Sequence, residues 1–195
     1  MNLENITFDN FMLLPSKDRR YILNDLESLK VLIKKNMSEK RYKHSLSVAD
    51  VCLNLAYHHH VDPLKAYKAG LLHDVCKDLD HDILNDYLKY YEPDKLNNIY
   101  GAYHAWVGKY YLKEKTNFHD SDILNAIYNH TICISRDKLS MILYIADKRE
   151  PLRNINDDIL QLAYKDLNKA FDKLSWSVER YIEEVKNERF VKNSL

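Results

Sequence analysis

Residues 63–78 read PLKAYKAGLLHDVCKD, and this stretch decides the fold. Its apolar residues recur at helical spacing: Ala66, Ala69, Leu72 and Val75. This spacing is typical of a helix that buries one face. Asp62 precedes the stretch and can accept hydrogen bonds from the first free N–H groups, and Pro63 suits the first helical position. The stretch therefore predicts a buried helix that carries the polar pair His73-Asp74 near its end.

Similar periodicity covers most of the chain, which has only three glycines and four prolines among 195 residues. So few turn residues can hardly support many hairpins, so the sequence predicts an all-α protein. We expect Asp80 to cap one helix and Pro151 to stop another. Residues 1–15 lack periodicity and form an unassigned arm, and residues 16–195 are expected to form a single helical domain. The expected helices lie near residues 16–36, 39–58, 63–78, 81–90, 104–115, 121–131, 137–149, 157–173 and 175–188.

The composition excludes several classes of protein. Apolar residues make up 46% of the chain and charged residues 30%, with 29 basic side chains balancing 29 acidic ones. These proportions are those of a globular protein and exclude disorder as the main state. A net charge of zero lacks the long-range positive field of a nonspecific nucleic-acid binder, so we expect no nucleic acid as a partner. No segment approaches the roughly 20 continuous apolar residues that span a bilayer, which predicts a cytoplasmic protein without a membrane partner.

Cysteine and glycine patterns exclude further kinds of site. The three cysteines, Cys52, Cys76 and Cys133, include no Cys-x-x-Cys pair, so neither a disulfide framework nor a zinc ribbon is indicated. Glycine-rich phosphate loops are absent as well. Any handling of phosphate must therefore use metal ions or basic side chains.

Six polar side chains lie at positions where helices should face the core: His44, His73, Asp74, His104, His130 and Asp147. A lone histidine on an apolar face is more often a hydrogen-bonded core residue than a metal ligand. An isolated buried carboxylate would cost several kcal/mol, so Asp74 and Asp147 each need a cation or a metal. A shared metal site satisfies both carboxylates and uses the imidazoles. Mixed imidazole and carboxylate ligands suit iron, manganese or zinc better than calcium or copper(I).

Two basic residues are candidate phosphate contacts. Lys77 lies one helical turn after His73, so its ammonium group could share a face with the His73-Asp74 pair. Arg153 follows directly after the expected helix stop at Pro151. Taken alone, each would more often be a solvated surface residue.

The pattern His44, His73-Asp74 and Asp147 resembles the signature of the HD-domain metal-dependent phosphohydrolases. The resemblance is closer to one branch, the YqeK family of bacterial symmetrical diadenosine tetraphosphate hydrolases, and it spans about residues 38–190. Five blocks in the same order carry it, at residues 41–49, 72–78, 104–108, 129–131 and 146–153.

The resemblance implies an HD-domain helical bundle with a central metal site. It implies a symmetrical bis(5'-nucleosyl)-tetraphosphatase that cuts diadenosine tetraphosphate into two ADP by means of a metal-activated water. The implied cofactor is iron, as one or two ions, with manganese, zinc or magnesium as alternatives. The metal ligands would be His44, His73, Asp74 and Asp147. His104 and His130 would bind a second metal or contact the phosphates.

The same resemblance gives catalytic roles to Asp74 and Lys77. Substrate contacts would come from Lys77, His104, His130 and Arg153. The expected partner is a small-molecule nucleotide, and a homodimer is one option for the assembly.

Two alternatives stay open. Another HD phosphohydrolase could act on nucleoside mono- or triphosphates or on guanosine alarmones, and substrate profiling separates these. A noncatalytic nucleotide- or metal-sensing module would bind its ligand without turnover. A sensor has no need of a bridging carboxylate, which argues against the second alternative.

Overall fold

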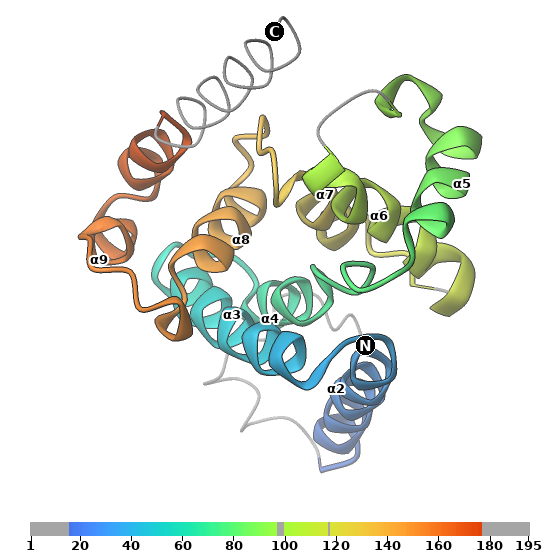
Figure 1. Ribbon diagram of the computed structural model, residues 1–195. Coiled ribbons are helices and arrows are strands. Elements are labelled where there is room, and N and C mark those ends of the chain that lie inside the picture. The colour runs from blue at the N-terminus through green and yellow to red at the C-terminus, as the bar shows by residue number, and fades with distance from the viewer. Residues whose placement is uncertain (1–15, 97–99, 117, 177–195) are drawn as a thin grey trace, which may run out of the picture.

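The computed structural model describes residues 16–96, 100–116 and 118–176, and within these residues every regular element is helical. The α-helices, drawn in Figure 1, are α2 (Ser16–Asn36), α3 (Glu39–His58), α4 (Pro63–Leu72), α5 (His81–Tyr91), α6 (Tyr103–Thr116), α7 (Ser121–Asn129), α8 (Lys138–Arg149) and α9 (Ile159–Lys165). Short 3-10 helices are η1 (Pro93–Lys95), η2 (Tyr100–Ala102) and η3 (Pro151–Arg153). The all-α prediction is confirmed. In the described part of the chain, no helix is both long and apolar enough to cross a membrane.

Helices α3, α4, α7 and α8 form the centre of the bundle, with α2, α5, α6 and α9 packed around them (Figure 1). Helix α8 is buried on all sides from Leu139 to Asp147. A helix that is buried over its whole circumference belongs in a core, and α8 packs against α3, α4, α7 and α9. The closest packing lies between α3 and α4, where Gly70 leaves no room for a side chain against Ala49.

Aspartate side chains stand at the N-termini of several helices. Asp62 accepts hydrogen bonds from the N–H groups of Leu64 and Lys65, as predicted. Asp137 caps α8 through the N–H of Ser140. Asp80 stands at the N-cap position of α5, but its side chain accepts no hydrogen bond from the described residues of that helix. The predicted capping hydrogen bond is therefore wrong.

Two predicted helices end earlier than expected. Helix α4 stops at Leu72 because the chain tightens into turns, with Val75 N–H bonded to Leu72 O and Lys77 N–H to Asp74 O. These i to i+3 hydrogen bonds place the pair His73-Asp74 on a turn instead of inside a helix. Helix α7 likewise stops at Asn129, so the helix predicted to reach residue 131 is two residues too long.

The C-terminal helices divide at a different residue from the one expected. The predicted helix 157–173 breaks at Asp166, whose extended backbone ends α9 and whose carboxylate accepts the N–H of Lys169. A second helical segment then runs through residues 167–176. The predicted helix 175–188 therefore does not begin at residue 175, and its remainder lies outside the described residues. The predicted arm at residues 1–15 also lies outside them.

Candidate metal centre

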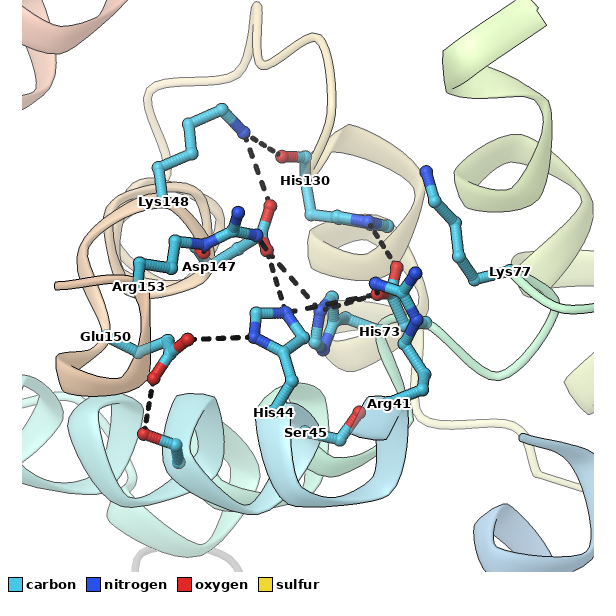
Figure 2. A network of polar contacts seen from close by, with 12 residues as sticks. Arg41, His44, Ser45, His73, Lys77, His130, Asp147, Lys148, Glu150 and Arg153 are labelled. Atoms are coloured by element: carbon cyan, nitrogen blue, oxygen red, sulfur yellow. Dashed lines mark hydrogen bonds and ion pairs between the residues drawn. The ribbon is translucent and has the colours of Figure 1, made fainter. Parts of the chain in front are cut away.

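The six polar side chains singled out in the sequence converge at the centre of the bundle. Figure 2 labels four of them: His44, His73, His130 and Asp147. The six side chains come from different elements, and five of them sit at or just beyond the ends of helices. His44 lies within α3, His73 and Asp74 follow α4, His104 begins α6, His130 follows α7, and Asp147 lies in the last turn of α8. All are buried except His44, which is half-buried.

The side chains of His44, His73 and Asp147 surround one small space. Asp147 Oδ1 lies 3.2 Å from His44 Nε2 and 3.6 Å from His73 Nε2. Ligand atoms from all three residues fall within 4.8 Å of one another. Two atoms that each lie about 2.1 Å from one ion are roughly 3 to 4 Å apart, so the spacing suits a shared cation.

A second group shares His73 and adds Asp74 and His130. The two carboxylate oxygens of Asp74 face different groups. Its Oδ2 lies 3.5 Å from His73 Nε2, and its Oδ1 lies 3.1 Å from His104 Nε2 and 3.5 Å from His130 Nε2. A carboxylate in this orientation can bridge two ions or join one ion to the surrounding imidazoles.

The hydrogen bonds of the imidazoles leave ligand nitrogens free. His73 Nδ1 donates to Gly70 O at 2.8 Å, His130 Nδ1 donates to Ile127 O at 2.7 Å, and His44 Nδ1 donates to Glu150 Oε1 at 3.0 Å. In the neutral form of each ring, Nε2 therefore carries its lone pair toward the carboxylates. His73 Nε2 is buried and has no hydrogen-bond partner among the described residues. A divalent cation would satisfy this buried atom, so the residues fit a metal.

Protonation states at this site also favour a cation. Burial opposes ionisation of Asp74 and Asp147, but neighbouring imidazoles and Lys148 outweigh it and hold both carboxyl pKa values well below the ordinary range. Burial lowers the pKa of His104 to about 4 and lowers that of His130 as well. These groups are therefore in their ligand forms at neutral pH, with ionised carboxylates and neutral imidazoles.

His73 has the opposite shift. Burial alone would lower its pKa, but the carboxylates of Asp74 and Asp147 raise it. The negative potential that stabilises a proton on this ring would stabilise a divalent cation in the same place.

Basic side chains surround the acidic centre. Lys77 Nζ donates to His104 Nδ1 at 3.2 Å, and Arg153 Nη2 lies 2.8 Å from Asp147 Oδ1, so both predicted basic residues lie at the site. Arg41 Nη1 lies 2.7 Å from Asp74 Oδ2. Burial lowers the pKa of Lys77. The sequence indicates Lys77 through its spacing from His73 and Arg153 through its place after Pro151.

Two further contacts escaped prediction from the sequence. Lys148 Nζ donates to His130 O at 2.9 Å and lies 3.5 Å from Asp147 Oδ2, although its position suggested only a charge at a helix end. Glu150 binds His44. No local spacing could have indicated this contact, since Glu150 and His44 lie 106 residues apart.

A cavity of about 610 Å³ opens beside His44, and Arg41 and Arg153 in its wall contact Asp74 and Asp147. Its lining includes Lys40, Arg41, Lys43 and Arg153, with Ile155 adding apolar surface. A pocket with this many cations, next to a site for a divalent metal, suits a ligand with several negative charges.

The fold and the side-chain cluster together define an all-helical protein with a buried His/Asp site for a divalent metal. The HD domain family matches residues 41–152, and the chain belongs to this family.

Three relatives show how far the similarity extends. The chain is 34% identical over 145 residues to a symmetrical bis(5'-nucleosyl)-tetraphosphatase of Staphylococcus aureus, covering 72% of this chain and 75% of that protein. It is 30% identical to a probable nicotinate-nucleotide adenylyltransferase/Ap4A hydrolase of Mycoplasma pneumoniae over 83% of this chain, which spans only 49% of that relative, about half its length. A crystal structure of a predicted HD superfamily hydrolase involved in NAD metabolism from Clostridium acetobutylicum matches with a TM-score of 0.74 and 32% identity, over 84% of this chain and 88% of that one.

Proposed function

We propose that this protein is a metal-dependent phosphohydrolase that cleaves diadenosine tetraphosphate symmetrically into two ADP. One observation carries the chemistry: the Asp74 carboxylate faces His73 with one oxygen and the His104–His130 pair with the other. The name of the Staphylococcus aureus relative, a symmetrical bis(5'-nucleosyl)-tetraphosphatase, supports the choice of substrate.

We assign the first metal to His44, His73, Asp74 and Asp147. When bound, a divalent metal supplies Lewis acidity, which activates water and offsets negative charge on the phosphoryl oxygens. Iron fits this mixed set of nitrogen and oxygen ligands, and manganese, zinc and magnesium are the alternatives to test.

His104 and His130 have different surroundings. His130 belongs to a group of three ligand atoms with His73 and Asp74, so it is placed to hold a second ion. His104 Nδ1 accepts a hydrogen bond from Lys77, which leaves its Nε2 to donate to Asp74 or to a phosphoryl oxygen. We therefore assign His104 to proton donation and phosphate contact.

Basic residues near the metal centre would bind the substrate. Arg153 lines the cavity and contacts Asp147, and Lys77 contacts His104, so each can offset the charge that develops on a phosphoryl group during the reaction. The lowered pKa of Lys77 suits a group that passes a proton toward the leaving phosphate. The nearby Cys76 is a poor candidate nucleophile because burial raises its thiol pKa, so water is the better attacking group.

The wider expectations follow from this activity. We infer that residues 16–195 act as one unit, and that the protein works in the cytoplasm, where nucleotide substrates occur. A homodimer remains one option for its assembly, to be tested by light scattering.

The test incubates the purified chain with diadenosine tetraphosphate and Fe²⁺ or Mn²⁺ without oxygen, and resolves the nucleotides by anion exchange. We expect ADP as the sole product and loss of turnover with a chelator. His73→Ala and Asp74→Ala should each abolish activity, whereas Asp122→Asn, an exposed carboxylate paired with Lys65, should leave it unchanged. AMP plus ATP, or turnover that persists with a chelator, would contradict the proposal.

The same assay separates the alternatives. Preferred hydrolysis of nucleoside mono- or triphosphates or of guanosine alarmones would indicate another HD phosphohydrolase. Metal and nucleotide binding without turnover of any of these compounds would indicate a sensing module.

A further inference from the structure

Glu150 is a buried carboxylate at the end of α8, only 2% exposed. Its oxygens are already occupied by protein donors. Oε1 accepts from His44 Nδ1 at 3.0 Å (Figure 2). Oε2 accepts from Ser47 Oγ at 2.6 Å and from the N–H of Leu152 at 2.7 Å. Glu150 therefore contacts the proposed metal ligand His44, on the side of the ring that faces away from the other ligands.

The position of His44 explains why it needs such a partner. His73 and His130 lie just after the ends of α4 and α7, and each Nδ1 donates to the carbonyl three residues back in its own segment. The carbonyl of Ile127 also accepts the backbone N–H of His130, at 3.3 Å. His44 lies inside α3, where the carbonyls one turn back are used by the helix itself. The Nδ1 of His44 instead finds its acceptor on another element, in Glu150, the residue that follows α8.

A carboxylate at this place is not needed by the local backbone. The end of a helix carries partial negative charge, so an anion there is unfavourable. Glu150 also caps η3 through the N–H of Leu152, but the oxygen of a glutamine could make the same hydrogen bond. The negative charge therefore has its clearest use in the contact with His44.

We propose that Glu150 is a positioning residue that fixes the ring orientation and tautomer of His44, so that its Nε2 lone pair faces the metal. This proposal rests on the metal role of His44 proposed above. An anionic acceptor at Nδ1 also makes Nε2 a stronger donor to the metal than a backbone carbonyl would.

Glu150→Gln tests the proposal with little change in shape. The obligate donor Leu152 N–H selects the amide oxygen, which leaves the amide NH₂ facing His44 Nδ1. The imidazole then carries its proton on Nε2, where it blocks coordination. A residue needed only for packing would show no change of tautomer.

The first measurement is nitrogen NMR of the full chain with ¹⁵N-labelled histidine and no metal, with His44→Ala used to identify the His44 signals. We expect the Nδ1–H tautomer in wild type and the Nε2–H tautomer in Glu150→Gln. The second is Mn²⁺ binding by electron paramagnetic resonance. We expect the dissociation constant to rise roughly 10- to 100-fold in Glu150→Gln, with no further rise when Glu150→Gln is added to His44→Ala.

The matched control is Glu92→Gln, which alters a half-buried carboxylate that accepts from Tyr110 and Tyr128 on another side of the bundle. It should leave both readouts at wild-type values. An unchanged His44 tautomer and Mn²⁺ affinity in Glu150→Gln would overturn the positioning role even if the wild type hydrolyses its substrate. Mn²⁺ binding that depends on Glu150, in a protein without hydrolase activity, would refute the proposed function and support the positioning role.

Discussion

Replacing Gly70 with alanine should separate the two helices that carry the metal centre. A Cβ atom at this position would lie 2.5 Å from Ala49 Cα and 2.8 Å from Ala49 N, both backbone atoms of α3. Carbon atoms in contact prefer about 3.5 to 4.0 Å, so α3 and α4 would have to move apart by about 1 Å. Such a shift moves His44, on α3, away from His73, whose Nδ1 is held by the carbonyl of Gly70 itself.

The size of the effect follows from two opposing contributions. Overpacking of a core costs about 1 to 3 kcal/mol, and rigid backbone on the opposite side favours the upper end. Alanine in place of glycine within a helix recovers about 1 kcal/mol through helix propensity. We therefore expect Gly70→Ala to lower the free energy of unfolding by about 2 kcal/mol, which corresponds to a fall in Tm of roughly 4 to 8 °C.

Urea unfolding of the metal-free protein measures this change, and Mn²⁺ titration measures its effect on the site. A displacement of ligands beyond about 0.5 Å should weaken metal binding about tenfold or more. Gly108→Ala is the matched control, because its Cβ would meet only side chains, at 3.2 Å from Ile127 Cγ2 and 3.9 Å from Val75 Cγ1. Wild-type stability and metal affinity in Gly70→Ala would refute the reasoning.

Three further predictions concern a cap, the metal and a substrate contact. Asp137→Ala should lower stability by about 1 kcal/mol through loss of the α8 cap. Burial opposes ionisation of Asp137, but hydrogen bonds from Ser135 and Ser140 lower its pKa, so its contribution is full above the unfolded value near about 3.9 and is lost as the pH falls through the lower folded value. Urea unfolding at pH 6 and pH 3 should therefore show a smaller deficit at pH 3. Chelation of a metal present at 100 times its dissociation constant should remove about 2.7 kcal/mol of stability, seen as a lower Tm in calorimetry. Lys77→Met should lower kcat roughly 10- to 100-fold without changing Mn²⁺ affinity, because Lys77 contacts His104 and no carboxylate ligand directly; equal loss of metal binding would contradict this role.

The identity of the helices could be predicted from the sequence because their apolar faces repeat along the chain. Their ends were harder to predict. The turn after Leu72 uses tight i to i+3 hydrogen bonds that keep nearly the same apolar spacing as an α-helix, so periodicity extends across it. The break at Asp166 depends on one residue that both ends a helix and caps the next, within an otherwise helical pattern.

Some residues of the candidate site could be predicted from the sequence, and others could not. Asp74 and Asp147 stood out because each follows an apolar run, where an unpaired carboxylate would be unfavourable. Glu150 did not, because its partner His44 lies 106 residues earlier, and a contact of that range has no local pattern. Lys148 was interpreted as a helix-end charge, since nothing in the sequence indicated that its ammonium group would turn back to the carbonyl of His130.

Anomalous diffraction from crystals grown with Mn²⁺ or Fe²⁺ tests the central claim most directly. We predict an anomalous peak about 2.0 to 2.3 Å from His44 Nε2, His73 Nε2 and a carboxylate oxygen of Asp147, with Asp74 completing the set. A metal bound elsewhere in a protein that is active with that metal, with these four side chains free of it, would contradict the account.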